Sequence, residues 1–382
     1  MVTLRPSFEG VDQDRFAMDA KPVAARSGVS EEVFHRMISL ERKRTERSHK
    51  AFLLMLLEMG DGISANNAQS SLAKILDVLF PATRETDIVG WYKNGRIVGT
   101  MFTEIDLEAK KQILSSVLAR ISRALEDNLN PEQFSQISIS FHWFPDEWQV
   151  TSRMPNVPVL YPDLARRDQA RRMSCILKRA MDICGSLFAL VLTSPIFLLI
   201  ALAVKLTSKG PVFFRQRRVG QYGVPFPMLK FRSMYANNNC SQHKEYVLQL
   251  IAGVAEKKPC NGNGQGVYKL TNDPRITSVG EFLRRTSLDE LPQFINVLKG
   301  EMSLVGPRPP IEYEVDKYDL WHRRRVMEAK PGITGLWQVN GRNRLAFNEM
   351  VRLDLIYARS WSPWLDLKIL LRTPRAVVAG AR

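Results

Sequence analysis

Two adjacent carboxylates, Asp289 and Glu290, are the residues of this chain whose types and setting best suit chemistry. The stretch Ser287-Leu288-Asp289-Glu290 also has the spacing of a capping box, so a plain helix start is one interpretation. Pro292 in the same turn places both acids at or just before a helix N-terminus, where anions are favoured. Such a pair suits phosphoryl chemistry, because one carboxylate can attack phosphorus while the other holds the divalent cation that neutralises a diphosphate leaving group.

Basic and turn-forming residues surround this acidic pair in the sequence. The stretch FFRQRRVGQYGVPFPMLKFRSM, residues 213–234, sets arginines and a lysine around two glycines. Guanidinium forks and backbone amides arranged in this way can bind phosphate oxygens. The stretch alone would equally suit a basic turn on a membrane surface. Further on, Gly306-Pro307-Arg308-Pro309 holds an arginine in a rigid turn, and residues 331–342 form a glycine-rich loop.

An apolar segment, residues 183–204, precedes this region and must position it. The segment carries no charge and has roughly the 20-residue length of a membrane helix. Ser194-Pro195 lies at its middle, where proline removes a backbone hydrogen bond and bends or breaks a helix. Both flanks are basic, so the positive-inside tendency places both ends in the cytoplasm. A re-entrant helical hairpin that returns at Ser194 and Pro195 satisfies both facts, while a kinked spanning helix and a buried core helix remain alternatives.

A second membrane signal lies near the C-terminus, between Trp361 and Arg372. Its tryptophans, leucines and basic side chains suit a helix that lies at the membrane interface. An ordinary amphipathic core helix is the alternative, because the same periodicity describes both.

The first part of the chain alternates helix-like and strand-like patterns between residues 30 and 150. Helices are expected at about 31–50, 68–79 and 108–128, and strands at 51–57, 87–91, 97–103 and 137–143. The turn Lys93-Asn94-Gly95-Arg96 predicts a tight hairpin between two of these strands, since Asn-Gly favours such turns. This order, with helices covering one face of a mixed sheet, indicates an α+β domain.

Length and charge bound the remaining possibilities. The chain has 382 residues, enough for two domains, and a net charge of +15 that suits an anionic partner. Nucleic acid is not expected as that partner, because no aromatic residues interleave a basic face and the apolar segment would be left unexplained. The four cysteines form no CxxC pair, so no zinc site is expected. The first thirty residues lack the apolar core of a secretory signal, so the N-terminus is expected to begin in the cytoplasm.

Taken together, the motifs of the second half are similar to those of the bacterial sugar transferases, the monotopic polyprenyl-phosphate phosphoglycosyl transferases. The resemblance covers residues 175–380 and rests on KRAMDICGS, the Ser194-Pro195 break, RRVGQYGVPFPMLKFRSM, DPRITSVGEFLRRTSLDELPQFINVLKGEMSLVGPRPP and PGITGLWQVNGR. It implies a mostly helical domain with a re-entrant membrane helix at 183–204. It also implies an active site on the cytosolic face of the bacterial inner membrane. The net charge and the basic residues beside the apolar segment, in turn, indicate anionic lipid as a partner.

The same resemblance implies a reaction and roles for individual residues. The expected activity is transfer of a sugar 1-phosphate from a UDP-sugar to undecaprenyl phosphate, which initiates exopolysaccharide or related glycan assembly. Asp289 would form a covalent phosphosugar intermediate and release UMP, and Glu290 would be the Mg²⁺ ligand. The implied candidates for phosphate or uridine contacts are Lys230, Arg232, Arg275, Arg285, Arg308 and Arg342.

Residues 31–150 resemble a GGDEF domain of the diguanylate cyclase type in the order and spacing of their elements. The hairpin tip that would be Gly-Gly-Asp-Glu-Phe is Lys-Asn-Gly-Arg-Ile at residues 93–97, so the metal-binding carboxylates are missing and the domain is expected to be degenerate. Arg84 and Asp87 keep the spacing of that family's inhibitory site, which implies cyclic di-GMP as a ligand. An ordinary solvated charge pair is the alternative.

The expected fold class is therefore α+β, with a flexible tail at 1–30, a GGDEF-like α/β sandwich at 31–150, a linker at 151–174 and the transferase domain at 175–382. The first domain would serve sensing or the formation of a homodimer. The alternative function is a nucleotide-sensing membrane scaffold of a polysaccharide assembly system, in which the transferase half is only an anchor. The intact Asp289-Glu290 pair argues against this alternative, because an anchor need not keep both acids.

Overall fold

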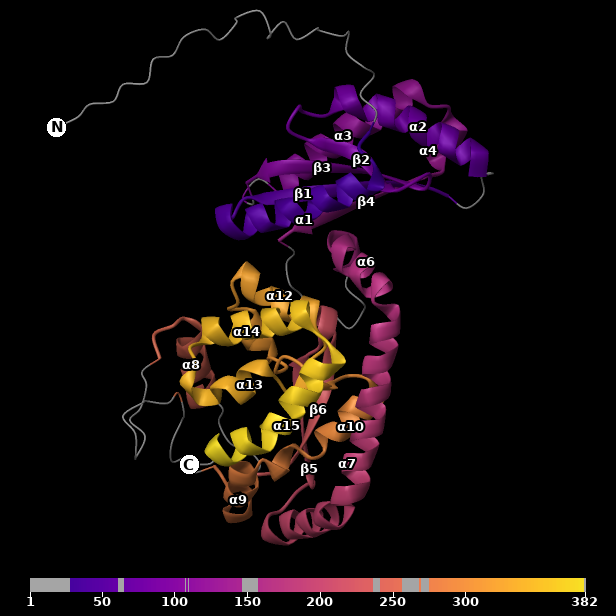
Figure 1. Cartoon of the computed structure of the whole chain (residues 1–382). Coiled ribbons are helices and arrows are strands. Elements are labelled where there is room, and N and C mark those ends of the chain that lie inside the picture. The colour runs from indigo at the N-terminus through magenta and orange to yellow at the C-terminus, as the bar shows by residue number, and fades with distance from the viewer. Residues whose placement is uncertain are drawn as a thin grey trace, which may run out of the picture. The chain divides into compact units, whose positions relative to one another are not determined.

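The computed structural model of the chain describes residues 28–60, 65–106, 110–145, 157–235, 241–255 and 275–380, with residues 108 and 268. The chain divides into two compact units (Figure 1). The first comprises residues 1–37 and 50–141, and the second comprises residues 38–49 and 142–382. Residues 1–27 of the expected tail lie outside the described residues.

The first unit is built on a four-stranded sheet with the order β2-β3-β1-β4. Strand β3 pairs antiparallel with both β1 and β2. Residues 51–57 of β1 are all buried. Because successive side chains of a strand point to opposite faces, both faces of β1 are covered, and the expectation that helices cover one face was wrong. The elements up to residue 144 are α1 (Glu31–Ser48), β1 (Ala51–Met59), α2 (Ala65–Ala82), β2 (Ile88–Lys93), β3 (Ile97–Ile105), α3 (Lys110–Asn128), α4 (Pro131–Ser135) and β4 (Ile137–Phe144). Of these, α1 from residue 38 onward and the last three residues of β4 count with the second unit.

The predicted hairpin joins β2 to β3. Lys93 pairs with Ile97 across the turn, and the amide of Arg96 donates to the carbonyl of Lys93 at 3.0 Å. Gly95 has a φ of 68°, a conformation that glycine adopts without steric cost. The element boundaries predicted for this unit agree with those of the structure to within a few residues, since long periodic segments carry most of the local signal.

The second unit is mostly helical and carries two small sheets. Strands β5 and β6 form an antiparallel pair, and β7 and β8 form a parallel pair. Its elements are α5 (Val157–Leu160), α6 (Pro162–Ala170), α7 (Arg172–Thr207), β5 (Phe213–Val219), η3 (Gln221–Gly223), β6 (Pro225–Phe231), α8 (Ser241–Ile251), α9 (Ser278–Thr286), η4 (Leu288–Glu290), α10 (Gln293–Lys299), β7 (Ser303–Val305), α11 (Glu312–Val315), α12 (Leu320–Glu328), β8 (Gly332–Thr334), α13 (Leu336–Asn340), η5 (Arg342–Arg344), α14 (Phe347–Ser360) and α15 (Pro363–Gly380).

The segment predicted as a linker, 151–174, is helical wherever the structure describes it beyond residue 157, apart from single residues between helices. Pro162 stands at the first position of α6, where its fixed φ suits a helix and its missing N–H costs nothing. Pro162 therefore starts a helix within the segment predicted as a linker.

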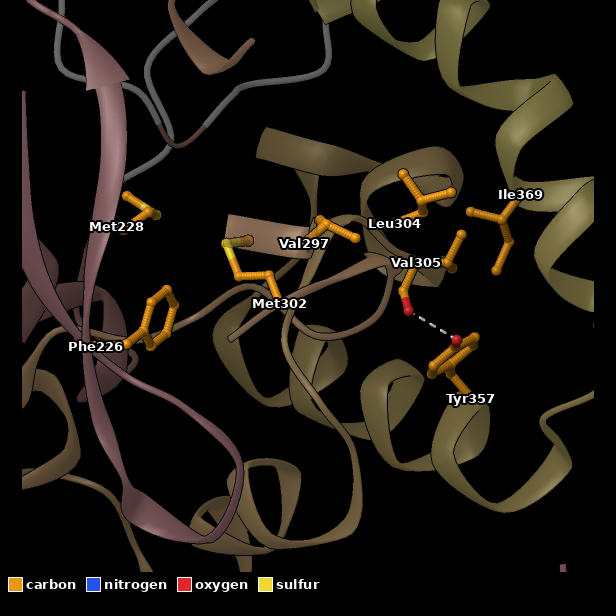
Figure 2. Packing of buried hydrophobic residues seen from close by; sticks show 8 residues of the cluster. All are labelled: Phe226, Met228, Val297, Met302, Leu304, Val305, Tyr357 and Ile369. Atoms are coloured by element: carbon orange, nitrogen blue, oxygen red, sulfur yellow. Dashed lines mark hydrogen bonds between the residues drawn. The ribbon is translucent and has the colours of Figure 1, made fainter. Parts of the chain in front are cut away.

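A buried apolar cluster holds the second unit together (Figure 2). Val297 of α10 packs between β6, β7 and the two C-terminal helices. The hydroxyl of Tyr357 on α14 donates to the carbonyl of Val305 at 2.9 Å, so this buried polar group is satisfied. The cluster consists of Phe226, Met228, Val297, Met302, Leu304, Val305, Tyr357 and Ile369. Because α10 follows Glu290 closely, this core fixes the position of the acidic pair.

Helix α7 contains the apolar segment predicted from the sequence, and it is longer than predicted, with 36 residues. It runs along one side of the second unit and changes direction in its last part (Figure 1). Pro195 cannot donate to the carbonyl of Val191, and the hydroxyl of Ser194 donates to that carbonyl at 2.8 Å instead. Ser194 thus satisfies the backbone group that the proline frees.

The two arms of α7, which are its parts before and after Pro195, both contact the second unit. Before the apolar segment, Arg179 donates to the carbonyls of Val297 and Leu298 at 2.6 and 2.7 Å, which caps the end of α10. After Pro195, Ile200 and Val204 pack in a cluster with β6 and α9. The most apolar stretch between them is only 11% buried, and the helix is long and apolar enough to cross a membrane.

Helix α15 combines a buried face, expected of a core helix, with exposed apolar side chains, expected of a helix at the membrane interface. Ile369 and Asp366 face the interior and are buried, whereas Trp364 and Leu371 are each 73% exposed. One face therefore packs in the core while aromatic and aliphatic side chains stand on the other.

Candidate active site

Asp289 and Glu290 lie on η4, a single turn between α9 and α10. Ser287 ends α9 in the left-handed conformation, with a φ of 58°, and its side chain makes no cap hydrogen bond. The spacing of a capping box is therefore present without its side-chain cap bond, although a helical turn does begin after Ser287. Asp289 is 7% exposed, so its carboxyl group is held in a nearly dry setting.

Lys230, near the end of β6, faces the acidic pair. Its Nζ lies 2.8 Å from Oε1 of Glu290, in a partly exposed ion pair. Asn296 of α10 holds β6 in place, because its Nδ2 donates to the carbonyl of Pro227 and its Oδ1 accepts from the amide of Leu229. The strand that carries Lys230 is thus bound to the helix that follows the acids.

Their surroundings drive the pKa values of the two acids in opposite directions. Burial raises the pKa of Asp289 to about 6, and the neighbouring Glu290 adds to this, against the opposing effects of Lys230 and Arg284. Burial also raises the pKa of Glu290, but Lys230, followed by Arg308 and Arg342, outweighs it and holds this pKa below its ordinary value. At neutral pH both acids are ionised, and Asp289 is the more basic of the two.

Arg308 follows β7 in the turn formed by residues 306–309. Its side chain is exposed, while its backbone is held by two buried arginines. Arg325 of α12 donates to the carbonyl of Arg308 at 3.3 Å, and Arg218 of β5 donates to the carbonyl of Pro309 at 2.9 Å. Burial and the nearby Arg308 lower the pKa of Arg218 to about 10. These two arginines hold the loop, so the guanidinium of Arg308 stays near the acids.

Arg342 reaches the site from the loop after α13. Its φ is 45°, and Nη2 donates to the hydroxyl of Ser287 at 3.4 Å. Ser287 and Arg342 are both non-glycine residues with left-handed backbone, a conformation that costs about 1–3 kcal/mol each and is common at functional sites.

The structure engages Arg232 elsewhere, whereas the roles predicted for Arg275 and Arg285 stay predictions. Arg232 is buried, and its Nη2 donates to the carbonyls of Val204 and Ser208 and to the Ser208 hydroxyl, so it caps the end of α7. Its prediction as a phosphate contact has no geometric support, because β6 ends at Phe231 and the chain leaves the strand there. Arg285 is exposed on α9. Arg275 contributes its carbonyl to a bond from the amide of Tyr235.

The residues missed from the sequence are those that position others: Asn296, Arg218 and Arg325. All three are buried polar side chains. The only signal that could have found them is their type, since a polar residue in an apolar helix or strand needs a buried partner. Which partner it finds is decided by the tertiary fold.

The donor set of the acidic pair fits Mg²⁺. This ion is held in proteins by one or two carboxylates together with substrate phosphates and water, and Asp289 and Glu290 provide two adjacent carboxylates. Among the described residues, no group of three or more acidic, histidine or cysteine side chains forms a site of its own. The protein would thus supply part of the coordination, and a diphosphate would supply the rest.

The second predicted ligand site, at Arg84 and Asp87, is a closed turn. The carboxylate of Asp87 accepts from the amide of Arg84 at 2.9 Å, and the amide of Asp87 donates to the carbonyl of Arg84 at 3.0 Å. The side chain of Arg84 is exposed. Asp87 therefore stabilises its own turn, and Arg84 is left as the group available to a ligand.

Comparison with known proteins agrees with this geometry in the second unit. A model of the bacterial sugar transferase family matches residues 173–380. The undecaprenyl-phosphate galactose phosphotransferase of Salmonella typhimurium is 44% identical over 212 residues, which are 55% of this chain and 42% of that protein. The UDP-glucose:undecaprenyl-phosphate glucose-1-phosphate transferase of Escherichia coli is 44% identical over 210 residues, 52% of this chain and 39% of that protein.

A shorter relative is covered almost completely. The exopolysaccharide production protein ExoY of Rhizobium meliloti is 38% identical over 226 residues, 59% of this chain and 95% of that protein. The chain therefore spans about two fifths of the longer relatives and nearly all of this one.

Solved structures similar to part of the chain include a DGC protein from Thermotoga maritima, with 18% identity, a TM-score of 0.26, and coverage of 32% of this chain and 86% of that one. The GGDEF domain of DgcB from Caulobacter crescentus has 12% identity, a TM-score of 0.23, and coverage of 37% and 80%. Scores this low establish no shared fold. The family match, in contrast, covers more than half of the chain, and the protein belongs to the bacterial sugar transferase family.

Proposed function

We propose that this protein transfers a sugar 1-phosphate from a UDP-sugar to undecaprenyl phosphate and so initiates the assembly of an exopolysaccharide or related glycan. The observation that carries the proposal is the buried Asp289, with its pKa raised to about 6, beside a Glu290 that Lys230 keeps ionised. The names of the relatives, sugar phosphotransferases acting on undecaprenyl phosphate, support the same donor and acceptor classes.

In the first step, a carboxylate oxygen of Asp289 attacks the phosphorus that bears the sugar. The bond from this phosphorus to the bridging oxygen breaks, and UMP leaves with that oxygen. In the second step, a phosphate oxygen of the polyprenyl phosphate attacks the phosphorus of the acyl phosphate, which frees Asp289 and yields a polyprenyl diphosphate sugar. A carboxylate is suited to this role because it leaves readily from phosphorus in the second step.

The other residues stabilise charge. Arg308 and Arg342, near Glu290, would bind phosphate oxygens through guanidinium forks. Lys230 orients Glu290 and adds positive charge near the diphosphate. Glu290, with the carboxylate of Asp289 next to it, would hold Mg²⁺, which neutralises the leaving phosphate.

We place the enzyme at the inner face of the cytoplasmic membrane, with α7 inserted and returning to the same side. Three features support this topology: the exposed apolar surface of α7, the proline bend, and the packing of both arms against one unit. The polyprenyl phosphate would then meet Asp289 at the lipid boundary, where its chain remains in the membrane.

The decisive experiment measures release of UMP from a panel of UDP-sugars, with polyprenyl phosphate and Mg²⁺. We expect Asp289→Asn to lose roughly 1,000-fold or more in turnover, because an amide is a poor nucleophile. Asp316→Asn, at an exposed acid of the same unit, is the matched control and should retain wild-type turnover. Donor labelled in the sugar-bearing phosphate should leave its label on Asp289 when the acceptor is omitted.

Equal turnover by wild type and Asp289→Asn would refute the nucleophile assignment. No UMP release by the wild type with any UDP-sugar would favour the scaffold alternative. The same panel identifies the sugar, for which UDP-glucose and UDP-galactose are the expected donors from the family.

We further propose that cyclic di-GMP binds the first unit through Arg84. The exposed guanidinium and the rigid turn closed by Asp87 support this, because a fixed arginine fork can hold a guanine edge or a phosphate. Calorimetry on the full chain should detect binding at micromolar ligand, and Arg84→Ala should abolish it. Absence of a heat signal from the wild type at that concentration would refute binding of cyclic di-GMP.

A further inference from the structure

A cavity of about 240 Å³ lies in the second unit, apart from the acidic pair. Its walls come from the N-terminal part of α7, from the loop after α12, and from β7 and α14. None of its lining residues belongs to the candidate active site. The lining residues are Arg167, Arg171, Cys175, Lys178, Arg179, Asp182, Gln221, Ser303, Val305, Glu328, Ala329, Lys330, Tyr357, Ala358 and Trp361.

The cavity is lined by five cations and two acids, and the acids are already engaged. Asp182 accepts from the Ser303 hydroxyl and the Leu304 amide, both at 2.9 Å. Glu328 accepts from Arg324 at 2.7 Å. Lys178 is neutralised by a third acid, Asp366, at 2.6 Å.

Arg167 pairs with Glu328 at 4.0 Å, whereas the three remaining cations, Arg171, Arg179 and Lys330, have no acidic partner among the described residues. Arg179 binds only carbonyl oxygens, and the contact of Arg171 is a 3.5 Å bond to the carbonyl of Arg359. Lys330 is half-buried and has no hydrogen-bond or ion-pair partner among the described residues. Burial lowers the pKa of Lys330, and Arg179 and Lys178 lower it further, against the weaker effect of Asp182. An anion in the cavity would relieve this repulsion.

The position of the cavity along α7 indicates which anion it meets. Lys178 precedes the start of the apolar segment at Ile183 by about 7.5 Å at the rise of a helix. The headgroup layer of a bilayer is of similar thickness. Met173 and Ile176 of the same helix are 78% and 55% exposed, so lipid chains can reach this height. Pockets for drug-sized ligands have volumes of roughly 300–1,000 Å³, so this smaller cavity suits a phosphate headgroup.

We propose that this cavity binds the phosphate headgroup of an anionic phospholipid, with Arg171, Arg179 and Lys330 as the binding cations. The inference rests on the membrane association proposed above. It goes beyond a diffuse attraction to the surface, because a built site depends on particular residues whereas diffuse attraction depends on total charge.

The test uses the full chain in detergent and follows thermal stability against short-chain phosphatidylglycerol, phosphatidylcholine and inorganic phosphate. We expect phosphatidylglycerol to raise the melting temperature and phosphatidylcholine to leave it unchanged. Lys330→Ala should weaken the apparent affinity about tenfold or more, and Lys330→Arg should restore it. Lys368→Ala, at an exposed lysine of α15 that does not line the cavity, is the matched control and should change affinity less than about twofold.

Arg171→Ala on another wall gives an independent result if Lys330→Ala is unstable. Equal affinities of wild type, Lys330→Ala and Arg171→Ala for phosphatidylglycerol would overturn the proposal. If inorganic phosphate raised the melting temperature as much as phosphatidylglycerol does, the cavity would still be a phosphate site. The proposal that a phospholipid supplies this phosphate would then be overturned. UMP release is measured on the same preparations, and the lysine variants should retain it at saturating substrate. A failure of the lipid site is thereby distinguished from a failure of the proposed function.

Discussion

The fold gives the two neighbouring acids of one short turn different surroundings. Asp289 points into a nearly dry setting with 7% exposure, and Glu290 remains 31% exposed against Lys230. A nucleophile benefits from a raised pKa, because basicity and nucleophilicity increase together while ionisation at neutral pH is retained. A metal ligand benefits from a lowered pKa, because it must be deprotonated to bind. The proposed assignment of the two roles rests on this contrast.

The first prediction concerns the pH dependence of UMP release. The pKa of Asp289 is about 6, and only the ionised carboxylate attacks. The rate should therefore rise with pH, to about a tenth of its plateau at pH 5, half at pH 6 and nine tenths at pH 7. Single-turnover rates without acceptor measure this step. A rate that is flat from pH 5 to pH 7 would contradict the raised pKa.

The second prediction concerns Lys230, which lowers the pKa of both acids. Replacement by methionine removes that effect, so the midpoint of the pH profile should move upward by about one unit and kcat/KM should fall roughly 100-fold. Lys299→Met, at an exposed lysine of α10, is the control and should leave the profile in place. An unshifted midpoint in Lys230→Met would show that the lysine does not control the ionisation of Asp289.

The acidic pair was accessible from sequence, because its two carboxylates are adjacent and stand near Pro292 and several arginines. The sequence did not show that Lys230 contacts Glu290 whereas Arg232 binds the end of α7. Alternation along a strand puts both on the same face, but β6 ends between them, at Phe231, and Arg232 turns to the end of α7. The ion pair of Lys230 with Glu290 spans 60 positions in the chain, a separation that no local pattern reports.

At the scale of elements, the site depends on how α7 and the loops around Arg308 are held. The proline, the basic flanks and the apolar run of α7 predicted its bend, because each acts locally on backbone or solvation. That both arms return to one globular unit became visible only with the tertiary contacts of Arg179 and Val204. The two arginines that fix the loop at Arg308 had no local signal.

The third prediction concerns the topology of α7. In a background with other cysteines removed, Cys175 or Lys209→Cys should react with an impermeant maleimide only from the cytosolic side. Pro195→Ala restores a straight helix about 54 Å long and should expose the second position to the opposite side in part of the molecules. Pro81→Ala, at a proline inside α2, is the control. Labelling of the wild-type ends from opposite sides would exclude a re-entrant helix.

The fourth prediction concerns Arg325, which is 5% exposed. Its Nη2 lies 2.6 Å from Oδ2 of Asp354, a residue that is 1% exposed. Burial raises the pKa of Asp354 to about 6 even though Arg325 opposes it. Arg325→Met leaves that charge uncompensated and should destabilise the protein by about 3–5 kcal/mol. Adding Asp354→Leu should recover most of the stability, measured by thermal unfolding in detergent.

Activity separates the two roles of Arg325. The double variant still lacks the donor to the carbonyl of Arg308, so its kcat/KM should stay below that of the wild type. Full activity in the double variant would show that the loop does not depend on this bond.

At the scale of the whole molecule, charge and apolar surface act together. The chain carries a net charge of +15, which attracts an anionic membrane, and α7 carries exposed leucine and phenylalanine side chains. The two contributions respond differently to salt, because the Debye length falls to about 3 Å at 1 M while apolar burial is not screened. Composition alone could not separate a peripheral from an inserted protein, since both can be basic.

The fifth prediction is that membranes retain the protein through a 1 M salt wash. Phe188 and Leu198 of α7 are 68% and 70% exposed, and each such side chain contributes about 1.5–3 kcal/mol when it is buried in lipid. About ten such side chains of α7 together contribute more to the free energy of membrane binding than the electrostatic attraction that salt removes. The control is a variant with Phe188, Leu198 and Leu202 changed to serine, which should be released more readily at 1 M salt than at 0.1 M. Release of the wild type by salt alone would mean that surface charge holds it, and an inserted α7 would then be excluded.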